Sequence, residues 1–356
     1  MEEKVLTEEE RKQKRQDRRK RKKYRLLILL LLMFGTGVML ATSTYAWFTS
    51  NQTVKVNTLN VNIQSQNGIQ ISTDGTKWKS IITREDITGA HATYATSVNQ
   101  LPNVLEPVST GGTIDSTGKL EMYYGTVDTN DGGDYIITAE KSTEVESNGD
   151  VDGKFIAFDL FFKVEKQTDI YITPNSGVST DDVTDTGIKN ASRIAFVELG
   201  NTTSGDTVAN IQALNGTNGT AASLHIWEPN YDSHTPAGVA NARDVYGKTV
   251  TDNSGAIDPY AGIIAPVAKA DDILLGQATQ TKDSTKFKDV TIEYKTKDGF
   301  THYIPAFSLQ SGVTKVRIYM WVEGQDVDCE NNASGGNINF DLQITTELPE
   351  GAQTTE

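Results

Sequence analysis

Apolar and polar residues alternate over many short segments of this chain, beginning near residue 54. Segments such as Leu59–Ile63 and Gly68–Ser72 place apolar residues at every second position. A period of two is typical of β-strands with one buried face. The strands expected on this basis, together with shorter apolar runs, are Val54–Asn57, Leu59–Ile63, Gly68–Ser72, Phe155–Val164, Ile170–Ile172, Arg193–Val197, Val290–Tyr294, Val313–Val322 and Ile338–Ile344.

One of these segments, Phe155–Val164, is almost continuously apolar, which predicts a central strand buried on both faces. Turn residues separate the segments, as at Asp74-Gly75, a hairpin signal. Helical periodicity is confined to Ala237–Tyr246 and Ala268–Leu275.

Many short strands with few helices predict an all-β fold. We expect an antiparallel β-sandwich of jelly-roll type over residues 64–346, with long decorated loops, one or two short helices and a polar tail at 347–356.

The start of the chain has the pattern of an export signal. A basic stretch at 11–25 precedes the apolar run Leu26–Thr42, and small residues follow up to Ala46. This order is typical of a secretory signal peptide. It predicts cleavage between Ala46 and Trp47, so that residues 1–46 serve for export and do not belong to the fold.

The alternative is that Leu26–Thr42 is retained as a membrane anchor. Its 17 residues give about 25 Å of helix, slightly less than a hydrocarbon core of about 30 Å. We favour cleavage, which limits membrane contact to residues 26–42 before processing. Either topology places the rest of the chain outside the cell.

Charge divides the chain at the same point. Residues 1–46 hold 12 Lys/Arg and 6 Asp/Glu, which leaves 21 basic and 41 acidic residues in the exported part. An acidic balance of this size argues against nucleic acid as a partner. We expect a solvated acidic surface, and calcium binding at acidic loops stays open.

The single cysteine, Cys329, excludes an intramolecular disulfide. The exported part must therefore be stabilised by its core and its strand pairing. The acidic neighbours of Cys329 would raise the pKa of its thiol, so we expect this cysteine to be buried or inert.

The segment between His225 and His234 is the most distinctive in the chain. It reads IWEPNYDS and combines two aromatic residues with two carboxylates. One interpretation is a loop whose aromatic residues pack onto the sandwich, and the other is a ligand loop. The residues of the candidate ligand loop are Trp227, Glu228, Tyr231, Asp232 and His234.

No sequence motif of a catalytic centre or metal site is present. The histidines lack the spacing of a zinc protease, and no nucleophile elbow, phosphate loop or dinucleotide motif occurs. The dense acidic run Glu323–Asp328 follows an expected strand and is interpreted as a solvated loop. We therefore assign no catalytic residue, no metal ligand and no cofactor.

The region around the cleavage site resembles the TasA/camelysin family of Gram-positive exported matrix proteins. The resemblance lies in Ser43–Phe48 (STYAWF) and continues through the first alternating strand to Ile63. Three later segments, Gly68–Trp78, Ile226–Thr235 and Trp321–Cys329, resemble uncharacterised exported proteins of Firmicutes.

The resemblance implies a jelly-roll subunit of an extracellular fibre, processed by a dedicated signal peptidase. In that scheme the new N-terminal segment 47–63 adds a strand to the next subunit. The candidate assembly residues are Trp47, Phe48, Val54, Val56, Leu59 and Val61. The alternative is that this segment is the first strand of its own sandwich.

Three hypotheses follow, in decreasing order of support. The first is a non-enzymatic structural protein, secreted to the cell surface or matrix and self-associating into fibres such as those of a biofilm. The second is an adhesin-like module that binds glycan or peptide through its loops. The third is a hydrolase.

Overall fold

The computed structural model describes most of the region expected to be exported. The chain divides into two compact units, Met1–Thr44 and Tyr45–Glu356, and every described residue belongs to the second. The described residues are 54–64, 69–129, 135–142, 144, 153–173, 175–180, 187–216, 223–244, 248, 257, 260–268, 283–292, 302–303, 305–329, 337–348 and 353–354.

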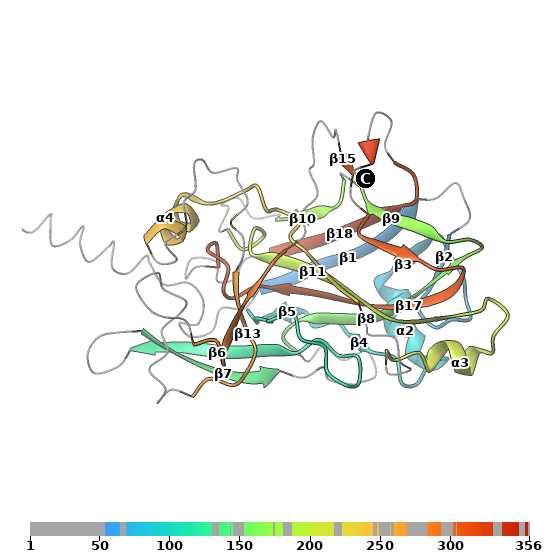
Figure 1. The fold of residues 1–356 in the computed structure, drawn as a ribbon, viewed down its shortest axis with the longest axis horizontal. Coiled ribbons are helices and arrows are strands. Elements are labelled where there is room, and N and C mark those ends of the chain that lie inside the picture. The colour runs from blue at the N-terminus through green and yellow to red at the C-terminus, as the bar shows by residue number, and fades with distance from the viewer. Residues whose placement is uncertain are drawn as a thin grey trace, which may run out of the picture. The chain divides into compact units, whose positions relative to one another are not determined.

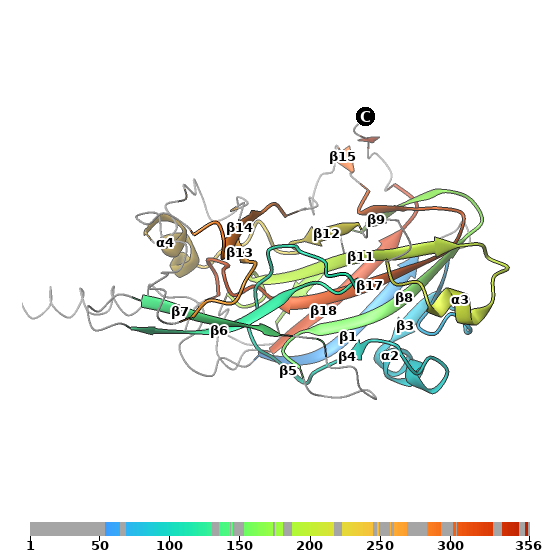
Figure 2. The ribbon, with the colours of Figure 1, turned by 60° about the horizontal axis from the view of Figure 1, so that its bottom comes forward.

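The all-β class is confirmed, because strands dominate the described residues (Figures 1 and 2). One sheet, here named sheet A, has the strand order β16-β9-β18-β1-β3, with β10 beside β18 and β5 beside β1. Its strands are β1 (Val54–Gln64), β3 (Ile81–Thr83), β5 (Val104–Leu105), β9 (Thr168–Ile172), β10 (Gly177–Ser179), β16 (Phe307–Leu309) and β18 (Asn337–Thr345).

The second large sheet, sheet B, has the order β12-β11-β17-β8-β2, with β4 beside β8. All its pairings are antiparallel. Its strands are β2 (Gln70–Ser72), β4 (Asn99–Gln100), β8 (Ile156–Val164), β11 (Ser192–Thr202), β12 (Leu224–Trp227) and β17 (Gly312–Val322).

Three small sheets and four short helical segments complete the described structure. The pairs are β6 (Met122–Thr129) with β7 (Tyr135–Ser142), β13 (Tyr260–Ile263) with β14 (Phe287–Val290), and β15 (His302–Tyr303) with β19 (Gln353–Thr354). The helices are α2 (Arg84–Gly89), the 3-10 helix η1 (Ala90–Ala92), α3 (Val208–Gln212) and α4 (Pro236–Asp244).

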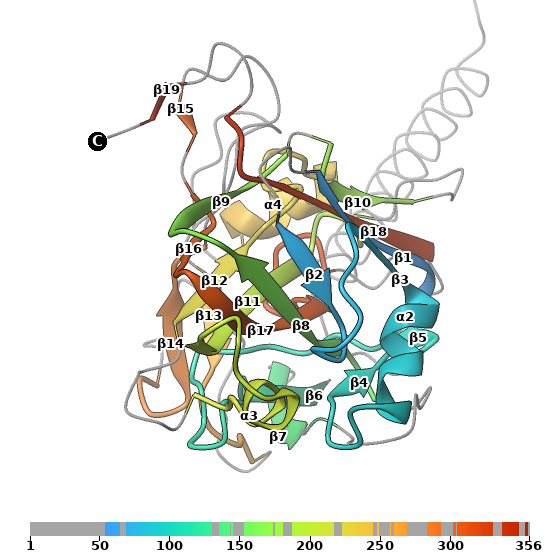
Figure 3. The same cartoon turned by 90° about the vertical axis from the view of Figure 1, so that its right-hand side faces the viewer.

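Sheets A and B share one hydrophobic core. Alternate residues of β8, β11 and β17 join alternate residues of β18 in a single buried cluster, exemplified by Phe158, Ile318 and Phe340. Figure 3 shows β18 and β1 on one side of β8 and β17, and β6, β7 and α3 on the other. Sheet B is therefore covered on both faces, which explains why β17 is buried at every position.

The face of sheet B that points away from sheet A carries charge as well as apolar residues. On β17 the alternate positions include Lys315, Arg317, Tyr319 and Trp321, none more than 5% exposed. On the neighbouring β8, Asp159 occupies the same face and is 1% exposed. Buried charges need partners, and these residues form the ion pairs described below.

The main strand predictions are confirmed. The segment Phe155–Val164 forms β8 and is buried on both faces, and Val313–Val322 lies within β17. The predicted helix at Ala237–Tyr246 corresponds to α4, whereas most of Ala268–Leu275 lies outside the described residues. The jelly-roll type of sandwich stays a prediction.

Two features differ from expectation. The pairing of β1 with β18 is parallel, so sheet A is mixed. Helix α2 was not predicted, although its Thr83-x-x-Asp86 capping box was visible in the sequence. A helix of six residues has no helical periodicity of its own, so a capping box alone does not distinguish it from a turn.

Candidate functional site

The candidate assembly strand is an interior strand of sheet A. Within the chain, β1 pairs with β18 on one side and with β3 and β5 on the other. Of the predicted assembly residues, Val54, Val56, Leu59 and Val61 belong to β1. The predicted cleavage residue Ala46 lies outside the described residues, as do Trp47 and Phe48.

The register of β1 matches its apolar residues to the buried rows of β18. Val56 is the partner of Ile338, and Leu59 is the partner of Phe340. These β18 residues are at most 1% exposed. A register shift between Val56 and Thr58 makes this match possible, because Val56 and Leu59 are an odd number of residues apart.

The candidate ligand loop lies largely inside the molecule. Trp227 ends β12, is 2% exposed and belongs to the core shared by the two sheets. Glu228 is 2% exposed, while Tyr231 and Asp232 are half-buried. The burial of Trp227 and Glu228 favours the interpretation of a loop packed onto the sheets, and ligand binding there stays a prediction.

Glu228 and His234 instead belong to a buried group of charges, here named the Arg193 cluster. It combines Arg193 of β11 with Tyr260 of β13 and with side chains from the segments after β12 and β17. Its members are Arg193, Glu228, His234, Tyr260, Glu323, Asp326 and Asp328.

Two carboxylates hold the guanidinium of Arg193. Its Nη1 lies 3.2 Å from Oε1 of Glu228, and its Nη2 donates to Asp326. The ring of Tyr260 lies 5.6 Å from the guanidinium carbon. Nearby, His234 Nδ1 lies 2.7 Å from Asp328, which also accepts from the backbone N–H of Thr235 at 2.8 Å.

Burial dominates the electrostatics of this cluster. It raises the pKa of Glu228 to about 8, because Arg193 only partly offsets the loss of hydration. It likewise raises the pKa of Glu323 to about 7, although Trp321 Nε1 and the Gln325 N–H donate to that carboxylate at 3.0 Å each. Glu228 therefore favours its neutral form near neutral pH, and Glu323 is neutral for a substantial fraction of the time.

The prediction of a solvated loop at Glu323–Asp328 is wrong. Every residue of this run is buried, and Glu323 and Asp328 are fully enclosed. Within this run, Glu323 and Asp326 interact with Arg193 of β11. The adjacent Cys329 is buried and forms no disulfide, as expected.

A second buried group, the Asp159 cluster, was not predicted at all. Arg317 Nε donates to Asp159 at 2.8 Å, Lys315 Nζ lies 3.3 Å from the same carboxylate, and Tyr94 donates to it at 3.0 Å. Burial opposes ionisation, but Arg317 and Lys315 outweigh it and lower the pKa of Asp159 to about 2. The only sequence signal was the presence of charged residues inside two strongly apolar strands.

Glu144 extends the Asp159 cluster. Its carboxylate accepts from the hydroxyl of Tyr319 and lies 3.3 Å from Lys119 and 3.9 Å from Arg317. Two carboxylates thus face three cationic side chains. The cluster links the segments that carry Tyr94, Lys119 and Glu144 to the outer face of sheet B. It has the character of a structural ion-pair network.

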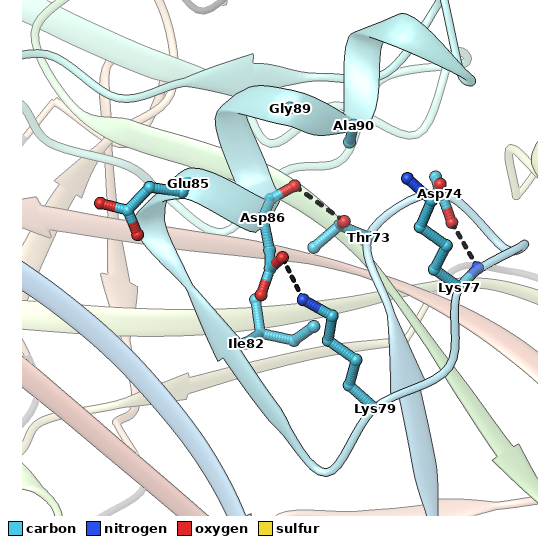
Figure 4. A pocket seen from close by; sticks show the side chains of 9 residues that line it. All are labelled: Thr73, Asp74, Lys77, Lys79, Ile82, Glu85, Asp86, Gly89 and Ala90. Carbon is cyan, nitrogen blue, oxygen red and sulfur yellow. Dashed lines mark hydrogen bonds and ion pairs between the residues drawn. The ribbon is translucent and has the colours of Figure 1, made fainter.

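A hollow of about 150 Å³ lies beside α2 (Figure 4). Figure 4 shows Lys79 reaching Asp86 across it. The side chain of Asp74 accepts from the N–H groups of Thr76 and Lys77, so it stabilises the turn in which Gly75 has φ of +71°. Of the charged side chains that line the hollow, Lys79 and Asp86 form an ion pair, and we assign no ligand to it.

Comparison with known proteins gives no match. No family model matches the chain, and no curated protein or solved structure matches it either. Among the described residues, no group of three or more His, Cys, Asp or Glu side chains is placed to hold a metal ion. The same residues contain no helix long and apolar enough to cross a membrane.

Proposed function

We propose that this protein is a non-enzymatic subunit of a cell-surface or extracellular-matrix fibre, assembled when β1 of one copy enters sheet A of the next. The observation that supports the proposal is the position of β1: the first described strand of the chain fills an interior position of a sheet. Residues 1–46 serve in this proposal as the signal peptide that is removed before assembly.

The edge of β18 that faces β1 needs a partner strand. Without β1, sheet A would expose unpaired backbone groups along the nine residues of β18. An open edge of this length is a template for another chain. The same pairings form whichever copy supplies β1, because strand pairing depends on sequence and register rather than on connectivity.

The side-chain pattern of β1 suits exchange between copies. On the buried rows Val61 is the partner of Leu342, and on the alternate rows Asn60 and Asn62 are the partners of Asp341 and Gln343. Burying each apolar side chain contributes about 1.5–3 kcal/mol before ordering costs. The strand carries one charge, Lys55, so it has little to desolvate.

The connection to the rest of the fold is short. Only five residues separate β1, which ends at Gln64 in sheet A, from β2, which begins at Gln70 in sheet B. Short hinge loops favour exchange of an element between copies. In the exchanged form, this connection links consecutive subunits.

Disulfide trapping tests the proposal directly. Asn60 and Asp341 are Cα partners in the parallel ladder, so cysteines at both positions lie within disulfide range. We would prepare residues 47–356 as two single variants, Asn60→Cys and Asp341→Cys, mix them under assembly conditions and oxidise. Strand donation predicts a covalent heterodimer, with filaments visible by negative-stain microscopy.

The matched control uses Asn57, which lies at the register shift and has no partner in β18. Asn57→Cys mixed with Asp341→Cys is expected to give little heterodimer. Buried Cys329 does not compete. If the double variant Asn60→Cys/Asp341→Cys closes only within monomers, and mixed single variants never cross-link, β1 belongs to its own sandwich and the proposal fails.

A further inference from the structure

The Arg193 cluster buries more negative than positive charge. Its four carboxyl groups face one guanidinium and one imidazole; the side chain of His234 is 2% exposed, and every other member is at most 6% exposed. Even with His234 protonated, full ionisation would leave two negative charges without a counter-charge. Buried charges of this kind are far more costly than neutral carboxyl groups.

The hydrogen bonding of Glu228 points the same way. Its Oε1 contacts Arg193, but its Oε2 is buried and has no hydrogen-bond partner. Asp326, in contrast, makes a direct hydrogen bond with Arg193 and also accepts from the Asp328 N–H at 2.8 Å. Of the two carboxyl groups beside Arg193, Asp326 is better solvated by the protein, so Glu228 is the one that favours a proton.

Arg193 and His234 are the cationic side chains that contact the carboxyl groups of the cluster. No three acidic or imidazole groups among them are arranged to hold a metal ion. The charged and titratable groups that act on Glu228 come from every element packed around it: Arg193, His234, Asp326 and Asp328. Tyr260 and Glu323 complete the set around Arg193. Protons on the carboxyl groups would balance the negative charge that Arg193 and His234 leave.

The cluster also joins separate parts of the chain. Glu228 and His234 lie on the segment Glu228–Asp244, which includes α4, while Asp328 belongs to the turn after β17. Gly238 of α4 packs so closely on Asp328 that a Cβ there would lie 2.2 Å from its Oδ1. Changing the charge of the cluster thus changes how this segment is held.

We propose that the Arg193 cluster is a protonation-controlled clasp: protons on Glu228 and Glu323 hold the segment Glu228–Asp244 against sheet B, and alkaline pH releases it. The inference is independent of fibre assembly. It predicts an exported protein whose fold tolerates mildly acidic conditions and loosens around α4 in alkaline ones.

Guanidinium unfolding of residues 47–356 at pH 6 and pH 9 tests the clasp, with wild type compared to Glu228→Gln. Glutamine is isosteric with a protonated Glu228. The unfolding equilibrium constant of the wild type is expected to rise at least about tenfold between the two pH values, because folding raises the proton affinity of the carboxyl groups. Glu228→Gln should reduce that rise severalfold and should be at least as stable as the wild type at pH 6, because only the wild type must bind a proton at this position when it folds.

The matched control is Glu165→Gln, a substitution at an exposed glutamate, which should retain the full wild-type rise. Hydrogen exchange at Leu224–Asp244, corrected for the intrinsic effect of pH, should report local opening of the wild type at pH 9. The infrared band of protonated carboxyl groups in the wild type at pH 7 provides a readout that does not depend on a variant folding. No such band, or a Glu228→Gln variant strongly destabilised at pH 6, would show an ionised Glu228 and overturn the clasp.

Discussion

The two buried charge clusters lie on the same face of sheet B but solve the problem of buried charge differently. In the Asp159 cluster, Arg317 and Lys315 both contact Asp159, whereas Glu144 has Lys119 at 3.3 Å and Arg317 at 3.9 Å, and burial still raises its pKa. In the Arg193 cluster, one guanidinium serves several carboxyl groups. The comparison teaches that the local balance of charge, rather than the number of ion pairs, sets the protonation state.

The opposite pKa shifts express this difference. Burial acts on the carboxyl groups of both clusters, yet the pKa of Asp159 falls to about 2 while that of Glu228 rises to about 8. Two cations outweigh desolvation in the first case, and one shared cation does not in the second. The predictions below test the comparison.

The largest effect is expected at Asp159. Asp159→Asn leaves Arg317 and Lys315 buried without their carboxylate, which should lower the free energy of unfolding by about 3–5 kcal/mol. Arg317 stays charged at both pH values, but burial already lowers the pKa of Lys315 and Asp159 opposes that effect, so the loss should be at least as large at pH 5 as at pH 8 in urea titrations. A loss below 1 kcal/mol would mean that Asp159 does not balance the two cations.

Arg193→Met should cost a similar amount at pH 8, about 3–5 kcal/mol. Its cost should shrink at pH 5, because Glu228 and the other freed carboxyl groups become protonated. Parallel urea titrations at the two pH values measure the change. A cost independent of pH would remove the distinction between the clusters.

Protonation of Asp159 in acid is expected to have an intermediate effect on the free energy of unfolding. Folding lowers the pKa of Asp159 from 3.8 to about 2, so its contribution is complete above pH 4 and is lost as pH falls through 2. The free energy of unfolding should decrease by about 2 kcal/mol from this group. Asp159→Asn has no carboxyl group to titrate, so this decrease should be absent in the variant. A dependence of stability on acid pH identical to that of the wild type would contradict the assignment.

The smallest effect is expected for an ion pair outside the clusters. Lys79 and Asp86 form a pair whose side chains are 45% and 21% exposed. Lys79→Met should change the free energy of unfolding by about 0–1 kcal/mol, since solvent screens the pair. Thermal unfolding in low and high salt provides the measurement, and a loss comparable to that of Asp159→Asn would show that burial is not the deciding factor.

The sequence predicted the strands better than the contacts among them. Alternation located β1 and β18, and apolar continuity located β8, because local patterning follows from which face is buried. It did not reveal that β1 and β18 run parallel. Strand direction depends on the path of the chain between elements that are far apart in sequence.

The candidate sites show the same division. The distinctive segment around Trp227 was recognised from its residues, and one of its two interpretations packed it onto the sheets, but Glu323–Asp328 was interpreted as a solvated loop. Acidic residues are mostly exposed in proteins, so composition favoured that interpretation. The buried partner, Arg193, lies more than a hundred residues away in sequence and gives no local signal.

What the sequence determined by itself was the class of fold, the position of the long strands and the acidic balance of the chain after residue 46, since each depends on local pattern or composition. Only the tertiary structure decided which strand lies inside sheet A and which charges are buried together. Both depend on contacts such as Val61 with Leu342 and Arg193 with Asp326, which form only when distant segments meet. The energy of a buried charge is set by these neighbours and not by its place in the chain.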